Sequence, residues 1–284
     1  MAKHPYMSAI NPIRFFEHYK IPKDGYMQKF ANTDDTYIQI ISDGSTFDLR
    51  VLNEQGADVT VINSIQQSSI TLAGKTFVTF KILFAGLKGI YQLRLIETRG
   101  EKQYFYYSMF ICVSPDNTKL TKLQYKNTFN RDDIKYRETT LSEGVDIFTI
   151  RTEGGFQEKN YIPKSNDTIY MKGDYRFHLL HSLAYYTRQF TIGDTFGISD
   201  ELFYTINNVF SCDTVYINDE GYTKFEGASF APTEIDHYAL RTWNIELAPT
   251  GDNLERDEQC ASLFCTGFLH PNQYLFNNSF LKVS

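Results

Sequence analysis

Short apolar runs separated by polar turns dominate the first half of the chain. The alternation is clearest over 47–51 and 91–95, where every second residue is Phe, Tyr, Leu or Val. A period of two is typical of a strand with one buried face. The pattern predicts seven short strands, at Thr36–Ile41, Phe47–Leu52, Asp58–Ile62, Ser69–Leu72, Thr76–Leu83, Gly89–Glu97 and Gln103–Val113. Such spacing indicates a β-sandwich over residues 36–116.

One of these strands carries a more specific signal. Gly89–Leu95 resembles the start of strand F in immunoglobulin-like domains, where a Tyr near the strand start bonds back to the upstream corner. Tyr91 is predicted to be that residue. The Cys…Trp…Cys framework of antibody domains is missing, so the resemblance implies an immunoglobulin-like sandwich without it. A plain alternating strand that contains a Tyr explains the same residues.

The second region, residues 118–284, is predicted to be a β-rich domain with one helix. Ser114–Asn117 is a strong stop that marks the boundary. Ser199 is a suitable N-cap for a helix over about 199–211, whose apolar residues recur at helical spacing and are expected to pack on a sheet. Strands are predicted at Val145–Thr152, Tyr185–Ile192, Thr214–Ile217, Tyr222–Glu226 and Leu240–Leu247.

Four segments lack a clear period. Residues 1–35 are punctuated by prolines and are interpreted as an N-terminal arm that a neighbouring subunit orders, or equally as a packed tail. The polar segment Gly154–Tyr175 is predicted to be a long exposed loop, which in a compact domain is usually functional. Gly251–Glu258 is predicted to be another loop. The tail after Pro271 is expected to add a strand to this domain or to a neighbour.

Composition narrows the possible classes of protein. The chain has 284 residues, of which 42% are hydrophobic and 22% charged, and its 23 Phe and 20 Tyr favour strands and interfaces. A net charge of −6 argues against a general nucleic-acid binder. We find neither a membrane-spanning apolar run nor a secretory signal in Met1–Lys20, and we expect the protein to fold in a cytoplasm. Free thiols are therefore expected at Cys112, Cys212, Cys260 and Cys265.

The search for catalytic motifs gives no candidate site. On a helix, His178 and His181 would share a face and could bind a metal together with a third ligand, but no such ligand lies nearby in the sequence. On a strand they point to opposite faces. Asp146, Glu153 and Glu226 are possible acid–base groups, yet each is expected to be a solvated strand residue. The pair Gly154-Gly155 is compatible with a backbone anion-binding nest, but a simple loop turn is the favoured interpretation. No catalytic, metal-binding or cofactor-binding residue is predicted.

The order of four sequence blocks in the second region carries a family resemblance. The blocks are Ile147–Phe156, Thr191–Ile198, Ile206–Ile217 and Tyr238–Leu247. Together they resemble a structural protein of phages and prophages of Bacteroidetes, including crAss-like podoviruses. The resemblance implies a virion component that forms a homomeric ring in the tail or the head–tail connection, assembled in the host cytoplasm. It implies neighbouring tail or connector proteins as further partners, and it implies no enzymatic residue.

The expected function is therefore structural, acting through subunit and partner interfaces, with no enzymatic activity, no cofactor, and neither membrane nor general nucleic-acid binding. A glycan-binding or receptor-binding β-sandwich module is the first alternative, since sandwiches with exposed Tyr often bind glycans. A wall- or glycan-degrading hydrolase is the second alternative, which the missing catalytic motifs disfavour.

Overall fold

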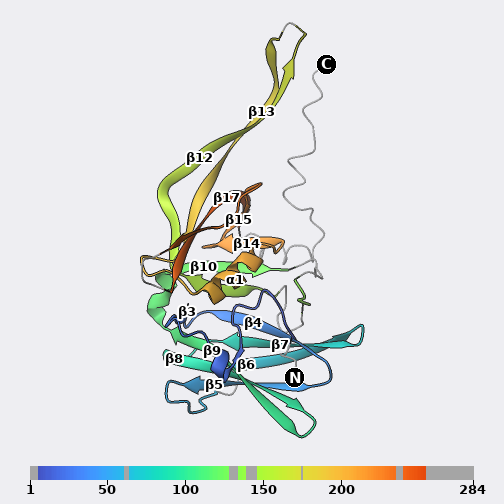
Figure 1. Cartoon of the computed structure of the whole chain (residues 1–284), viewed down its shortest axis with the longest axis vertical. Helices are drawn as coiled ribbons and strands as arrows, with labels where there is room; N and C mark the ends of the chain where they lie inside the picture. The colour runs from blue at the N-terminus through green and yellow to red at the C-terminus, as the bar shows by residue number, and fades with distance from the viewer. Residues whose placement is uncertain are drawn as a thin grey trace, which may run out of the picture.

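The computed structural model describes residues 6–60, 64–127, 134–138, 146–173, 175–234 and 239–253. It is a mainly β protein, as predicted, and α1 (Asp200–Val209) is its one α-helix within those ranges. Its long axis runs from a sandwich at one end, through a second β-rich layer that carries α1, to a projecting hairpin at the other (Figure 1). The tail after Pro271 and the thiols Cys260 and Cys265 lie outside the described residues.

The first half forms two facing sheets. One sheet has the order β1-β4-β7-β6, and the other contains β9-β8-β5 as one end of a larger sheet. Their strands are β1 (Tyr6–Met7), β4 (Asp35–Ser42), β5 (Thr46–Asn53), β6 (Ile65–Leu72), β7 (Lys75–Leu83), β8 (Gly89–Arg99) and β9 (Lys102–Val113). Alternate residues of both sheets, such as Ile38, Phe80, Leu49 and Leu93, are buried between them in one apolar core. Six of the seven predicted strands are thereby confirmed.

The remaining predicted strand, Asp58–Ile62, is wrong over its described residues 58–60. Asp58 makes only an isolated bridge to Leu52. The Asp58 carboxylate instead accepts hydrogen bonds from the backbone N–H and the hydroxyl of Thr60. Such local bonds satisfy backbone groups that a strand ladder would otherwise use.

The larger sheet continues from the sandwich into the second half of the chain. Its order is β12-β13-β17-β15-β14-β10-β11-β3-β9-β8-β5, with β16 on β17 and β2 on β9. The strands not yet given are β2 (Phe16–Glu17), β3 (Gln28–Phe30), β10 (Thr121–Lys126), β11 (Phe148–Thr152), β12 (Gly154–Met171), β13 (Phe177–Ile192), β14 (Thr214–Ile217), β15 (Glu220–Lys224), β16 (Ala231–Glu234) and β17 (Arg241–Asn253). Short 3-10 turns, η1 (His18–Lys20) and η2 (Pro115–Lys119), complete the described elements. One continuous sheet therefore contains strands from both sides of the boundary predicted at 114–117.

The second half has its own apolar core beneath α1. Ser199 caps the helix by accepting a hydrogen bond from the Glu201 N–H, as the sequence predicts. Leu202, Ile206 and Val209 are buried against strands of the sheet, which confirms the expected packing of the apolar stripe. The strands predicted at Thr214–Ile217 and Tyr222–Glu226 are found as β14 and β15, which form a hairpin with Asn218 and Asp219 at positive φ in its two-residue turn.

The N-terminal segment belongs to both cores. Ile10 and Tyr26 are buried in the core under α1, whereas Ile13, Phe15 and Phe30 are buried in the sandwich core. Short strand β3 pairs with β9 on one side and with β11 on the other. From the sequence, residues 1–35 are interpreted either as an arm ordered by a neighbour or as a packed tail. Residues 6–35 pack against their own chain, as the second interpretation predicts.

Candidate assembly surface

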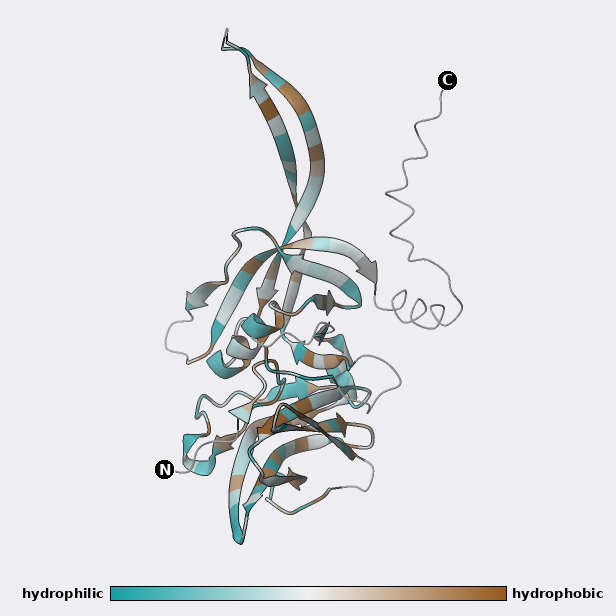
Figure 2. Cartoon of the chain, turned by 90° about the vertical axis from the view of Figure 1, so that its right-hand side faces the viewer, coloured by the Kyte–Doolittle hydropathy of each residue, from teal (hydrophilic) through white to brown (hydrophobic). Residues whose placement is uncertain are grey.

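A long β-hairpin projects from the body of the molecule. Strands β12 and β13 pair antiparallel from Gly154↔Ile192 to Met171↔Phe177. Only the base, Arg188–Ile192, also pairs with β17. On the tip side of this base, the two strands extend as a ribbon away from the rest of the protein, as both views show (Figures 1 and 2).

This hairpin corrects the prediction of a loop at Gly154–Tyr175. None of the residues of β12 whose burial is described is buried, so the segment is polar and the apolar alternation that signals a strand is weak. Gly154-Gly155 likewise does not form a free turn, since both residues begin β12. A Cβ at Gly154 would stand 2.2 Å from the Thr191 carbonyl oxygen, so the close approach of β13 requires glycine there.

The base of the hairpin is firmly attached. The ring of Phe156 lies 5.0 Å from that of Phe190 and 4.7 Å from that of Tyr222, and the Arg188 guanidinium lies 4.0 Å above Phe156. Arg188 also donates a 2.9 Å hydrogen bond to the Tyr222 hydroxyl. Burial, with a hydrogen bond to Glu220 next, raises the pKa of Tyr222 to about 12.

A second contact holds the ribbon where it leaves the sheet. Lys164 of β12 lies 2.8 Å from the Glu246 carboxylate of β17, and the Thr187 hydroxyl donates to the same carboxylate. The hydrogen bond from Lys164 is the largest cause that lowers the pKa of Glu246, followed by the one from Thr187. The ionised form of Glu246 is therefore the one that stabilises the hairpin base.

The hairpin tip presents a wholly apolar set of side chains on one face. Cross-strand partners lie on the same face, as do residues two apart. The pairs Ile169↔Leu179 and Met171↔Phe177 therefore form one cluster, which we call the tip cluster. All four side chains are at least half exposed: Ile169 57%, Leu179 62%, Met171 50% and Phe177 72%.

A polar belt lies below the tip cluster on the same face. Asp167 accepts hydrogen bonds from the Ser182 and Ser165 hydroxyls, and these bonds lower the pKa of Asp167. Leu180 is the extra residue of a β-bulge between the belt and the tip, where the register shifts. The tip therefore combines a defined strand geometry with four large apolar groups in water, which is typical of a surface that another molecule covers.

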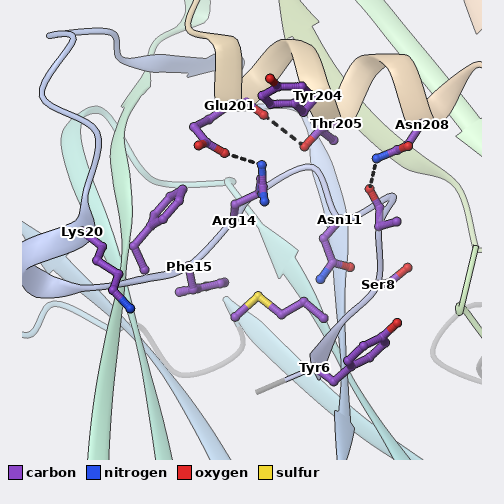
Figure 3. A pocket seen from close by; sticks show the side chains of 13 residues that line it. Tyr6, Ser8, Asn11, Arg14, Phe15, Lys20, Glu201, Tyr204, Thr205 and Asn208 are labelled. Atoms are coloured by element: carbon purple, nitrogen blue, oxygen red, sulfur yellow. Dashed lines mark hydrogen bonds and ion pairs between the residues drawn. The ribbon is translucent and has the colours of Figure 1, made fainter. Parts of the chain in front are cut away.

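A groove runs between α1 and the N-terminal segment on the body. Its volume is about 670 Å³. The Arg14–Glu201 ion pair lies within it, and Asn208 donates to the Ala9 carbonyl at one end (Figure 3). Tyr6, Phe15 and Tyr204 contribute aromatic rings to its walls. The groove combines aromatic surface with charges that already have partners, which suits a peptide segment better than a reaction centre.

Two of the three candidate acid–base residues are not solvated, contrary to expectation. Asp146 is 1% exposed and accepts a 2.5 Å hydrogen bond from the Tyr136 hydroxyl. Glu153 is 5% exposed, forms an ion pair with Lys29 and accepts a hydrogen bond from Tyr26. Glu153 joins the N-terminal segment to residues more than a hundred positions further along the chain, whereas Asp146 bonds to a residue ten positions away. Both contacts give the carboxylates a structural role. Glu226 is exposed, as expected.

Burial around these acids also affects the two tyrosines. Desolvation, followed by the neighbouring carboxylate, raises the pKa of Tyr26 and of Tyr136 well above the ordinary range. Each phenol therefore keeps its proton and remains a hydrogen-bond donor.

The two histidines of the hairpin lie on β13. His178 pairs with Tyr170 and His181 with Thr168, and both are exposed. Across the described ranges, no three His, Cys, Asp or Glu side chains gather in a way that suits a metal ion. Cys112 is a free thiol, as predicted.

No family model matches this chain, and no curated protein matches its sequence. Within the described residues, no helix has the length and apolar character required to cross a membrane.

Proposed function

We propose that this protein is a virion structural component that assembles as a homo-oligomeric ring in a phage tail or head–tail connection. The observation that carries the proposal is the exposed tip cluster at the end of a rigidly attached hairpin. Burying a large apolar side chain stabilises a complex by about 1.5–3 kcal/mol. Four such groups on one ribbon face supply the driving force that a repeated subunit contact requires.

The placement of the hairpin also supports a ring. The tip cluster lies at one end of the long axis, whereas the aromatic groove lies on the body (Figures 1 and 3). Contacts between unlike surfaces are heterologous, and they generate closed rings when the rotation between subunits closes. The family resemblance of the second region points to the same kind of assembly.

We further propose that the sandwich is immunoglobulin-like. Its sheets β1-β4-β7-β6 and β9-β8-β5 follow the order of strands A-B-E-D and G-F-C in constant-type immunoglobulin domains. Tyr91, near the start of β8, donates a 3.1 Å hydrogen bond from its hydroxyl to the Lys88 carbonyl and accepts one from the Lys88 N–H. Such a domain serves here as a docking surface for neighbouring tail or connector proteins.

A glycan- or receptor-binding module is the second candidate. Tyr161, Tyr170, Tyr175 and Tyr186 are exposed on the hairpin, where flat rings can stack on sugars. A glycan array with the purified full-length chain tests this candidate. Strong, specific binding by a chain that stays monomeric would favour it over the ring.

The first experiment measures the mass of the full-length protein by light scattering, followed by negative-stain imaging. We expect discrete rings, and we expect Phe177→Ser combined with Leu179→Ser to weaken assembly by about ten-fold or more, because the tip cluster loses its apolar area. Phe110→Ser combined with Phe196→Ser is the matched control, since both rings are exposed on the body. Equal assembly of the tip variant and the wild type would contradict the proposal.

A further inference from the structure

The hairpin carries two strand edges that have no strand partner among the described residues. Strand β12 pairs only with β13, so its outer edge is open from Gly154 to Met171. Strand β13 pairs with β17 only at Arg188–Ile192, so its other edge is open over 177–187. Alternate N–H and C=O groups along such an edge point outward and can pair with another strand.

A ribbon of two strands is incomplete by itself. Two-stranded hairpins are marginally stable in water, and three or more strands are usually needed. The part above the base, 161–171 of β12 and 177–187 of β13, has open edges on both strands. It is about 11 residues, or about 36 Å, long at 3.3 Å per residue. A partner that completes it must offer an open strand edge of similar length.

The two open edges fit each other. Strands β12 and β13 already pair inside the hairpin, so β12 of one copy can pair with β13 of the next in the same register. This pairing repeats the same side-chain neighbours, and it places Ile169 beside Leu179 and Met171 beside Phe177. Charges are compatible too, because Lys164 falls beside Tyr185 and Asp167 beside Ser182. No like charges meet over this stretch.

We infer that the hairpins of neighbouring copies pair edge to edge, β12 of one with β13 of the next. The inference rests on the proposed homo-oligomeric ring and names the surface that builds it. Because the two edges differ, the contact is heterologous and repeats around an axis. The result is one antiparallel wall of hairpins, in which the tip clusters form a continuous apolar band.

The test uses two variants of the full chain, each with one added cysteine beside the four native ones. Ser165→Cys lies on β12 and Ala184→Cys on β13, at cross-strand partner positions. The two variants are co-expressed, assembled and mildly oxidised, and peptide mass spectrometry identifies the joined residues. Since each chain carries only one of the new thiols, a bond between positions 165 and 184 joins two copies.

We expect this bond in yield about ten-fold or more above that of Ser165→Cys co-expressed with Glu101→Cys, because proximity raises the effective concentration of the thiols. Glu101 is the matched control, since it is exposed in the turn between β8 and β9. Rings that form without the 165–184 bond would overturn the edge pairing and leave the ring proposal standing. A chain that remains monomeric at all concentrations would overturn both.

Two other results would assign the edges to different occupants. Efficient bonding of Ser165→Cys to itself would indicate a two-fold β12–β12 contact and overturn the repeating one. Hydrogen exchange of the unassembled chain gives the second readout. Amide protection along the outer edge of β12 that disappears when residues 254–284 are removed would assign that edge to the C-terminal segment of the same chain, and overturn pairing between copies.

Discussion

The junction between the two halves of the molecule and the projecting hairpin have opposite surfaces. At the junction, Arg151 of β11 makes 2.6 and 2.8 Å hydrogen bonds to the Asp34 carboxylate, and both side chains are buried. Phe148 beside it is fully buried. On the hairpin, Phe177 and Leu179 face water. The junction finds its partners within the chain, whereas the apolar side chains of the hairpin tip are exposed, and we propose that another molecule covers them.

The two regions also differ in how many neighbouring strands pair with each strand. Strand β11 lies between β10 and β3, and the Thr36 hydroxyl donates to the Thr149 carbonyl across the junction. Among the described residues, each strand of the upper hairpin pairs with one other strand. We therefore expect changes at the junction to alter the stability of the single chain, and changes at the hairpin to alter assembly.

The largest expected effect follows from Phe148→Ala. The Phe148 ring lies 5.0 Å from Tyr125 and 4.7 Å from Tyr136, so its removal leaves a cavity in the core. We expect the free energy of unfolding to fall by about 4 kcal/mol, measured by urea denaturation. Phe177→Ala is the matched control and is expected to change it by less than about 0.5 kcal/mol. Equal losses would erase the distinction between junction and hairpin.

A somewhat smaller effect is expected from Arg151→Met. This change leaves the buried Asp34 carboxylate with the Ala31 N–H as its remaining described donor, and it should cost about 3 kcal/mol of unfolding free energy. Combining it with Asp34→Asn removes the uncompensated charge, so the double variant should regain part of that loss in the same assay. A double variant less stable than Arg151→Met alone would show that the pair is not coupled in this way.

The smallest effect concerns the hairpin base. Glu246→Gln removes the charge that contacts Lys164, and we expect a loss of about 0.5 kcal/mol near pH 6. Because the pKa of Glu246 is lowered in the folded state, its contribution is present above the unfolded pKa of about 4.3 and disappears as the pH falls through the folded value. Thermal unfolding between pH 6 and pH 3 should therefore show the variant and the wild type converging. Glu226→Gln, at an exposed turn, should show no such trend.

Periodicity predicted much of the fold because half-buried strands and an amphipathic helix leave a direct trace in the sequence. Strands β5 and β8 alternate between one buried apolar face and one polar face, and their ends lie within about two residues of the prediction. The helix α1 was predictable from Ser199 and the apolar spacing that follows it. In each case the pattern is local, so no tertiary information was needed.

The hairpin and the buried acids were not predictable in this way. Above its base, the residues of β12 whose burial is described are exposed or half-buried, so its polar residues resemble those of a loop. The one available signal was the density of apolar and aromatic residues within 169–171 and 177–180, where His178 is the one exception. Such residues are frequent in strands and unusual in an exposed loop. Glu153 is buried because Lys29 and Tyr26, more than a hundred residues away in the sequence, meet it.

The sequence by itself determined the class of fold, the strands of the sandwich, the helix and its buried face, because each depends on spacing between near neighbours. Only the tertiary structure decided that one sheet joins both halves, that residues 6–35 complete two cores, and that Gly154–Ile192 forms a ribbon with open edges. These features depend on which distant strands meet, and a carboxylate or an aromatic ring looks the same in the sequence whether such a partner buries it or leaves it in water.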